Sequence, residues 1–373
     1  MVGAPRDFSW TRNQNNEEPG GLKKTATIVL CCGRSRGTDL ANHYGTAMER
    51  RREYIRNVAY SLNMRYVLGF DGGGSKTECV LMNATRMILA RTHSGPSNPA
   101  RVGAAAALAA LKQSASAAFA EAAVKATELA AVCAGLAGTG DPGLSQQMFS
   151  GLTEWFPQAA MRVCTDLDAA LAATGEPPAI VLIAGTGSAA MGSDAAGQTA
   201  RAGGHGPLLG DQGSAYDVGR RAVLACVRNS ERSGRDSSLG KQVLRQLGCA
   251  NWLEVQQRAA RTADDVFPRL FPVVTAACDS NDDIACALLK NAASDLAALV
   301  ETVTLRLSLG ATEFFLAKLG GMLGRSAFFD ERLDAALRKA APTARIGLLP
   351  MSPAEGAAHL ALGLIPNVEL TPN

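Results

Sequence analysis

Two short glycine-rich segments have the residue types of a phosphate-binding turn. Segment 71–77 (DGGGSKT) follows the apolar run 66–70, and segment 185–188 (GTGS) follows the apolar run 179–184. Glycines let backbone N–H groups turn toward an anion without obstruction by a Cβ, and both segments place a small hydroxyl residue in the turn. Either turn alone is equally consistent with a hairpin that binds nothing. Two of them about a hundred residues apart indicate two related half-structures that hold one polyphosphate between them.

The first turn carries side chains that could contact a nucleotide. Ser75 can donate a hydroxyl hydrogen bond, and Lys76 can add positive charge if it faces the anion. Asp71 ends the strand and could hold Mg²⁺ through water, because magnesium prefers a few carboxylates together with phosphate oxygens. The turn is not a Walker A loop, since no Gly-Lys-Ser/Thr follows a four-residue gap. It is not a dinucleotide fingerprint either, because a strand rather than a helix follows the glycines.

An aspartate lies between the two turns, where a strand leads into a helix. Asp166 follows the short expected strand 162–165 and precedes the second turn. A carboxylate there could accept the proton of a hydroxyl group that attacks a γ-phosphate. It could equally be the N-cap of the expected helix 166–173. Asp168 is the weaker candidate for the same base, because it lies further round the first helical turn.

The segment 201–216 is the densest in glycine and polar residues. Five glycines fall within 203–213, which is costly in backbone entropy unless close contacts or unusual dihedrals require them. His205 and Asp211 could hydrogen-bond a polyhydroxylated ligand, although His205 taken alone could be a structural histidine. We expect Pro207–Leu209 to anchor the segment by packing, which makes a flexible linker the weaker interpretation.

Composition and charge limit the classes of protein that fit. Of the 373 residues, 47% are hydrophobic and 19% are charged, enough for one large or two smaller globular domains. A net charge of +3 is too weak to indicate nucleic-acid or membrane binding by itself. No apolar run has the length of a membrane-spanning helix, and the N-terminus lacks an export signal. The nine cysteines form no CxxC pair or zinc cluster, so we expect buried free thiols in a reducing cytoplasm.

Residues 1–63 differ from the rest of the chain. They hold ten Lys or Arg against six Asp or Glu, with little apolar sequence. An unstructured tail, or sequence translated upstream of the true start, explains them better than a basic interaction patch at Arg50–Arg52. Met64 directly precedes the first expected strand, so we expect a chain that begins there to be fully active.

Beyond Met64 the pattern alternates between strands and helices. Apolar runs and turn residues predict strands near 66–70, 77–83, 87–93, 129–136, 162–165, 180–183 and 314–319. Ala-rich helices are expected before residue 129, a mostly helical region extends to about residue 309, and a closing helix with small residues on one face is expected at 353–364. The alternation favours an α/β class with mixed sheets, and Glu176–Pro178 marks the expected domain boundary.

In their order and spacing these motifs resemble the N-acetylglucosamine kinase branch of the BadF/BadG/BcrA/BcrD-type ATPase family, within the sugar kinase, Hsp70 and actin superfamily. Besides the two turns, the segments that carry the resemblance are Gly95–Asn98, Ala134–Gly138, Thr165–Asp166 and Gly203–Tyr216. The resemblance extends from about Tyr66 to Leu364. It implies an α/β fold of two ribonuclease-H-like (actin-like ATPase) domains with a cleft between them. Domain I would comprise 64–177 plus 354–373, and domain II would comprise 178–353.

The resemblance also implies roles for individual residues. Those implied to bind ATP are Gly73, Gly74, Ser75, Lys76, Gly185, Thr186, Gly187, Gly320 and Gly321. Those implied to bind the sugar are Asn98, Asp166, Ser188, Gly204, His205, Gly206 and Asp211. Asp166 would in addition be the catalytic base, and Asp71 would lie near Mg²⁺.

Three positions depart from the family pattern. His205 stands where tryptophan is common, Gln212 where glutamate is usual, and Asp217 where an aromatic residue is usual. Histidine replaces the stacking face and indole donor of tryptophan with a smaller, titratable ring. These differences leave phosphoryl transfer untouched and leave open which sugar binds.

The resemblance therefore implies a cytoplasmic kinase that uses ATP and Mg²⁺ to phosphorylate an amino sugar. The best single choice of acceptor is the 6-hydroxyl of N-acetyl-D-glucosamine. The partners of this kinase would be small molecules rather than nucleic acid or membranes, with a homodimer as one option. Glucosamine or N-acetylmuramic acid as substrate is the nearest alternative. An activating ATPase that holds an iron–sulfur cluster between two subunits is a weaker one, since no cysteine cluster flanks the motifs of the cleft.

Overall fold

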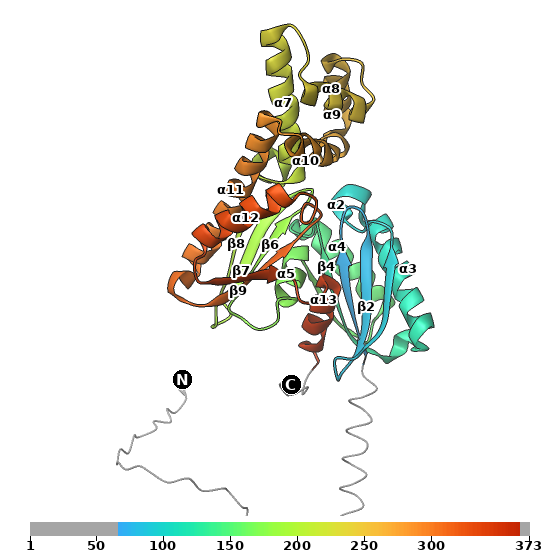
Figure 1. The fold of residues 1–373 in the computed structure, drawn as a ribbon. Helices are drawn as coiled ribbons and strands as arrows, with labels where there is room; N and C mark the ends of the chain where they lie inside the picture. Colours follow the sequence, from blue (N-terminus) through green and yellow to red (C-terminus); the bar gives the residue numbers. More distant parts are fainter. Residues whose placement is uncertain (1–65, 366–373) are drawn as a thin grey trace, which may run out of the picture. The chain divides into compact units, whose positions relative to one another are not determined.

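The computed structural model describes residues 66–365, all of which belong to one compact unit of the chain. The predicted N-terminal extension, 1–63, and the expected start at Met64 lie outside the described residues. The described part contains two five-stranded mixed sheets with helices packed on them (Figure 1). None of the helices in this part is long and apolar enough to cross a membrane.

The first sheet contains the first glycine turn. Its strands lie in the order β3-β2-β1-β4-β5, with β1 to β3 antiparallel and β4 and β5 parallel to β1. Their bounds are β1 Tyr66–Gly72, β2 Thr77–Asn83, β3 Ile88–Ser94, β4 Leu129–Leu136 and β5 Ala160–Cys164. Alternate residues of β1 enter different cores: Leu68 packs in the core formed with α3 (Ala104–Ala122), and Val67 in the core formed with α13 (Pro353–Leu362). Helices therefore cover both faces, which explains the continuous apolar runs.

The second sheet contains the second glycine turn and repeats the pairing pattern of the first. Its order is β10-β9-β6-β7-β8, with β6 to β8 antiparallel and β9 and β10 parallel to β6. The bounds are β6 Ala179–Ala184, β7 Ser188–Ser193, β8 Thr199–Gly203, β9 Phe314–Leu319 and β10 Ala344–Leu348. Helix α11 (Asp283–Arg306) packs along this sheet, and α12 (Ala327–Ala340) packs on α11 (Figure 1). The expectation of two related half-structures is confirmed at the level of topology.

The remaining elements connect these layers. They are α2 Pro99–Val102, η1 Ala126–Glu128, α4 Pro142–Trp155, α5 Asp166–Ala172, α6 Gly206–Leu209, α7 Ala215–Ser233, α8 Ser238–Leu247, α9 Trp252–Val266, η2 Pro268–Leu270, α10 Phe271–Asp279 and η3 Leu309–Ala311. Each expected strand and the closing helix are present within a few residues of their predicted bounds. Three strands are not among the predicted ones: β7, β8 and β10. β8 and β10 are short strands at the sheet edges, and the apolar run in each of the three is short.

Helix α5 links the two sheets. Leu167 is buried against Val181 of the second sheet, while the same helix packs on α13, which lies on the first sheet. Gly356 of α13 permits this close packing, because a Cβ there would lie 2.2 Å from the carbonyl oxygen of Ala169. The helix that begins at Asp166 is thus held by both halves of the fold.

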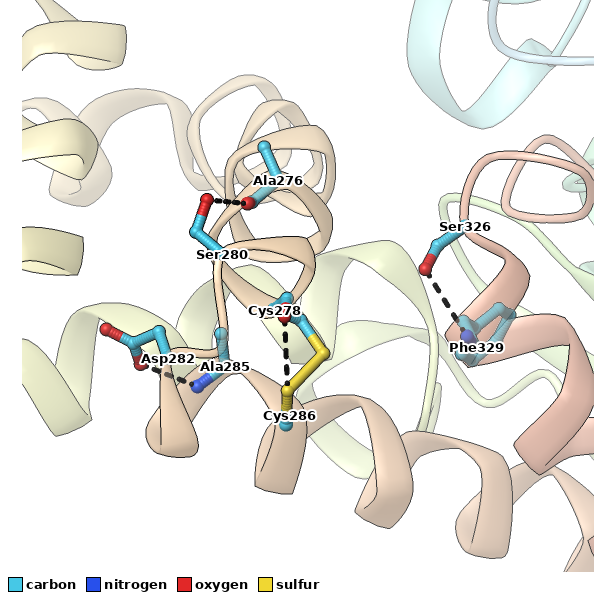
Figure 2. Close-up of a disulfide and its surroundings, with 8 residues drawn as sticks. All are labelled: Ala276, Cys278, Ser280, Asp282, Ala285, Cys286, Ser326 and Phe329. Carbon is cyan, nitrogen blue, oxygen red and sulfur yellow. Dashed lines mark hydrogen bonds between the residues drawn. A yellow bond between two sulfur atoms is a disulfide. The ribbon is translucent and has the colours of Figure 1, made fainter.

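Two of the cysteines form a disulfide. Cys278, at the end of α10, is joined to Cys286, in the first turns of α11, across a Cα separation of 4.8 Å (Figure 2). The expectation of free thiols is therefore wrong for this pair, although Cys79, Cys133, Cys164, Cys226 and Cys249 are free. The tight turn through Asn281, with φ of 61°, folds α11 back on α10 and brings the two residues within disulfide range. A spacing of eight residues carries no such information by itself.

Candidate active site

A cavity of about 400 Å³ lies between the two glycine turns, and both turns contribute to its wall. Twelve of the predicted site residues line it: Gly73, Gly74, Ser75, Asn98, Asp166, Gly185, Thr186, Gly187, Ser188, Gly204, Gly206 and Asp211. Five others are not part of the wall, although each lies in or beside a turn or loop close to it: Asp71, Lys76, His205, Gly320 and Gly321. Segments far apart in the sequence thus converge on one cavity.

The first turn is held in place by the loop that carries Asn98. The backbone N–H groups of Ser97 and Asn98 both donate to the carbonyl oxygen of Gly73 at 3.1 Å. The buried Thr77 hydroxyl is hydrogen-bonded to the Ser97 hydroxyl at 2.7 Å. Asn98 Oδ1 accepts the N–H of Ala100 and so caps α2, which leaves the side-chain N–H groups to donate to a ligand. The turn and Asn98 therefore form one connected unit of the wall.

The second turn is held by the start of α7 and the loop that precedes it. The N–H of Ala215 donates to the carbonyl oxygen of Gly185 at 2.9 Å. The Ser188 hydroxyl donates to the carbonyl oxygen of Gln212 at 2.7 Å. Because its proton is used in this bond, the Ser188 hydroxyl can offer a ligand only an acceptor.

The glycine pair after β9 lies against the end of β6. Gly320 has φ of 127°, and a Cβ on it would lie 2.2 Å from the carbonyl oxygen of Ala184. The N–H of Met322 donates to that same oxygen at 3.1 Å. Gly320 and Gly321, which directly follow β9, are therefore placed next to the end of β6, where the second turn begins.

Asp166 lines the cavity at the first position of α5. The N-cap is Thr165: its hydroxyl accepts the N–H of Asp168 at 3.3 Å, and the Asp168 carboxylate accepts the N–H of Thr165 at 2.9 Å. The alternative interpretation of Asp166 as the N-cap is therefore wrong, and it is Asp168 that takes part in the cap. Burial raises the pKa of Asp166, opposed by the Leu167 N–H and by nearby Arg201. A raised pKa suits a carboxylate that accepts protons near neutral pH.

The glycine-rich loop after β8 adopts backbone conformations that favour glycine. Gly203, Gly204 and Gly206 have φ of 74°, 70° and 77°. A Cβ on Gly204 would lie 2.2 Å from Nη2 of Arg201. That nitrogen donates to the carbonyl oxygen of Gly204 at 2.7 Å, and Nε of the same arginine donates to the carbonyl oxygen of Gly203 at 3.3 Å. Arg201 therefore fixes the shape of the loop.

Asp211 joins this loop to the second turn. Its φ of 59° is uncommon for a residue other than glycine. Its Oδ1 accepts the N–H of Ser188 at 3.1 Å, and a Cβ on Gly187 would lie 3.0 Å from the carboxylate. Burial raises the pKa of Asp211, opposed by the Ser188 hydrogen bond. The absence of a side chain at Gly187 gives the carboxylate room beside the turn.

The expectation that Pro207–Leu209 anchors the loop by packing is wrong. Leu208 is 92% exposed and Leu209 is 82% exposed, because the short helix α6 carries both side chains outward. The hydrogen bonds of Arg201 and Asp211 hold the loop instead.

Four polar side chains of the wall are missed by sequence reasoning: Arg101, Arg201, Tyr216 and Asp264. Arg101 follows Asn98 by three residues, and Arg201 and Tyr216 are the two ends of the glycine-rich segment, so proximity to the motifs is a signal that could have found them. Asp264 lies in the helical region, at the end of α9, where no motif marks it.

Asp71 lies at the end of β1, close to Asp166. Burial raises the pKa of Asp71 to about 7, with further contributions from the charges of Asp166 and Glu78 and an opposing one from Lys76. Among the described residues no group of three or more His, Cys, Asp or Glu could hold a metal ion by itself. Asp71 and Asp166 are two carboxylates whose charges favour a nearby cation, but they do not complete a metal-binding site by themselves. This suits a magnesium ion, which keeps water and phosphate oxygens as its other ligands.

The raised pKa of Asp71 predicts a pH-dependent effect of Asp71→Asn. The proton is held more tightly in the folded than in the unfolded protein, so folding stability falls as pH rises from about 4 through about 7. Asparagine does not ionise, so the variant lacks this loss. The free energy of unfolding of the variant minus that of wild type should therefore increase between these pH values, by up to about 4 kcal/mol. Urea unfolding at pH 4.5 and pH 8, without divalent ions, measures the gain. A stability difference that does not change with pH would contradict the burial of an ionisable Asp71.

Known kinases resemble this chain along most of its length. It is 28% identical over 305 residues to an N-acetylmuramic acid/N-acetylglucosamine kinase of Clostridium acetobutylicum, covering 80% of this chain and 98% of the relative. It is 28% identical over 309 residues to an N-acetyl-D-glucosamine kinase of Dictyostelium discoideum, covering 79% and 97%. A solved structure from Chromobacterium violaceum, described as a candidate N-acetylglucosamine kinase, matches with a TM-score of 0.65 at 25% identity, covering 79% of this chain and 98% of that one.

Residues 68–361 match the BadF/BadG/BcrA/BcrD ATPase family, and the chain therefore belongs to this family. The family resemblance noted in the sequence is confirmed. The predicted α/β class with its actin-like ATPase fold is also confirmed. Two sheets of the same topology flank the cavity, and the solved relative shares the fold. Membership of this family implies the use of ATP.

Proposed function

We propose that this chain is an ATP-dependent amino-sugar kinase that transfers the γ-phosphoryl group to the 6-hydroxyl of N-acetyl-D-glucosamine. The kinases of Clostridium acetobutylicum and Dictyostelium discoideum are both named for N-acetylglucosamine, and this chain matches each of them over nearly its whole length. The observation that carries the proposal is the position of Asp166, which lines one cavity together with both glycine turns.

The two turns would hold the triphosphate from opposite sides. The backbone N–H groups of the glycines and the hydroxyls of Ser75 and Thr186 are the donors that a polyphosphate requires. The proposed nucleotide ligands are Gly73, Gly74, Ser75, Lys76, Gly185, Thr186, Gly187, Gly320 and Gly321. Asp71 would face the magnesium ion, which when bound neutralises charge on the phosphates.

The sugar would lie against the glycine-rich loop and Asn98. The proposed ligands are Asn98, Asp166, Ser188, Gly204, His205, Gly206 and Asp211. Asn98 offers donors, Ser188 and Asp211 offer acceptors, and the bare backbone at Gly204 and Gly206 allows a sugar ring to approach closely. Such a mixture suits a ligand with several hydroxyl groups.

Asp166 would perform the chemical step as the general base. Its carboxylate accepts the proton of the attacking hydroxyl as the new P–O bond forms and the bond to the leaving β-phosphate breaks. We further propose that 64–177 plus 354–373 form domain I and 178–353 form domain II, which close on the sugar to align the hydroxyl and exclude water. Cytoplasmic location and a homodimer remain predictions.

Coupled ADP release across a panel of sugars tests the proposed function. We expect N-acetylglucosamine to give the highest kcat/KM among N-acetylglucosamine, glucosamine, N-acetylmuramic acid, N-acetylmannosamine and glucose. A preference for glucosamine or N-acetylmuramic acid would select one of the alternative substrates. ATP hydrolysis that no sugar accelerates would reject the kinase and favour an activating ATPase, for which iron-type visible absorption of the purified protein is the further check.

A further inference from the structure

Arg101 is a cation beside the first glycine turn to which the proposed mechanism gives no role. It lies in α2 and lines the cavity. A Cβ on Gly74 would lie 2.8 Å from Nη1 of Arg101 and 3.2 Å from its Cδ, so the arginine side chain lies directly against this glycine. The guanidinium is thereby placed at the turn whose backbone is proposed to bind phosphate.

The wall of the cavity offers little positive charge to a triphosphate. Its basic residues, within the described part of the chain, are Arg101 and Arg201, whereas three aspartates belong to the same wall. Arg201 already donates to the carbonyl oxygens of Gly203 and Gly204 and shapes the loop. Arg101 is therefore the better placed of the two to neutralise the negative charge of an entering nucleotide. A guanidinium can donate two parallel hydrogen bonds to one phosphate.

Arg101 makes an ion pair that is easily exchanged. Its Nη2 lies 3.8 Å from Oδ1 of Asp265, at the end of α9, and the two side chains are 37% and 62% exposed. Ion pairs of this exposure typically contribute about 0–1 kcal/mol. A phosphate carries more charge than a carboxylate and accepts a bidentate contact, so exchange of Asp265 for a phosphate is favourable.

We propose that Arg101 is a ligand of the β- or γ-phosphate of ATP and that Asp265 holds it while no nucleotide is bound. The proposal rests on the nucleotide site proposed above, between the two turns. Asp265 then acts as a competitor of the phosphate for Arg101. Removal of the aspartate and removal of the arginine should therefore change nucleotide affinity in opposite directions.

Isothermal titration calorimetry of the full chain with ATP, ADP and AMP, in the absence of sugar, tests the proposal. Arg101→Gln should weaken ATP binding about tenfold, weaken ADP binding less, and leave AMP binding unchanged. Asp265→Asn should strengthen ATP binding up to about threefold, and should have no effect once Arg101 is Gln. Lys112→Gln removes a positive charge from α3, outside the cavity wall, and is the matched control with unchanged affinities.

Three outcomes would overturn the proposal. The first is unchanged ATP binding in Arg101→Gln, and the second is an equal loss for AMP, which would indicate a structural role. The third is an effect of Asp265→Asn that persists without Arg101. A parallel titration with N-acetylmuramic acid shows whether the arginine serves a carboxylate-bearing sugar instead. Arg101→Gln could show the expected losses of ATP and ADP affinity in a chain that phosphorylates no sugar. That result would support Arg101 as a phosphate ligand and reject the proposed kinase activity, so the two proposals can fail separately.

Discussion

Replacement of Asp166 by asparagine is expected to lower kcat for sugar phosphorylation by about 10²–10⁴-fold and to leave sugar binding within a few-fold of wild type. The substitution keeps the size of the side chain and an oxygen that can accept the Leu167 N–H, as Asp166 Oδ1 does at 3.1 Å. It removes only the ability to accept a proton. Single-turnover phosphorylation separates the chemical step from product release, and sugar titration measures binding.

Asp168→Asn is the matched control for this experiment. Asp168 lies two residues further along the same helix, and its carboxylate accepts hydrogen bonds from Thr165 in the helix cap. Its substitution should lower stability by about 1 kcal/mol and change kcat far less than Asp166→Asn does. Normal turnover in Asp166→Asn, or an equal loss in both variants, would show that Asp166 is not the base.

Gly69→Ala is expected to destabilise the protein by about 3 kcal/mol or more. Gly69 lies in β1 where α13 crosses the strand, and a Cβ there would lie 2.2 Å from both the carbonyl oxygen of Ala354 and the nitrogen of Ala358. These are backbone atoms of a buried helix, so they cannot move aside as a flexible side chain could. The first sheet and α13 must separate, and α13 in turn supports α5, the helix that carries Asp166.

Gly310→Ala provides the same chemical change without the clash. No atom lies within 4 Å of the position that its Cβ would take, and the backbone there has no positive φ. Its stability should stay within about 1 kcal/mol of wild type. Urea unfolding midpoints of the two variants give the comparison. Equal stability of Gly69→Ala and Gly310→Ala would contradict the close packing of α13 on β1.

The sequence predicts those parts of the site that rest on local backbone chemistry. Each glycine turn stands out because a continuous apolar strand leads into it, and both turns indeed line one cavity. The dense glycines of the segment 203–213 predict unusual dihedrals, which Gly203, Gly204 and Gly206 adopt. The closing helix is predicted by its small residues, although only the structure shows that they allow contact with β1.

Other features depend on how the chain is arranged in space, which the sequence pattern does not reveal. Asp264 enters the wall of the cavity from the far end of α9. The leucines after Pro207 have an apolar composition typical of packing residues, yet no element within residues 66–365 covers them. The pairing of Cys278 with Cys286 depends on the reversal of the chain between two helices. Asp166 and Asp168 could exchange roles by sequence alone, and the hydrogen bonds of Thr165 distinguish them.

Identification of the phosphorylated product is the most direct test of an amino-sugar kinase that uses Asp166 as its base. The full chain is incubated with ATP, Mg²⁺ and N-acetylglucosamine, and the products are followed by phosphorus and carbon NMR. The predicted result is a sugar phosphomonoester whose phosphorus couples to carbon 6, formed in step with ADP and lost in Asp166→Asn. Release of ADP and inorganic phosphate without a sugar ester, in the wild-type chain, would contradict the proposed function.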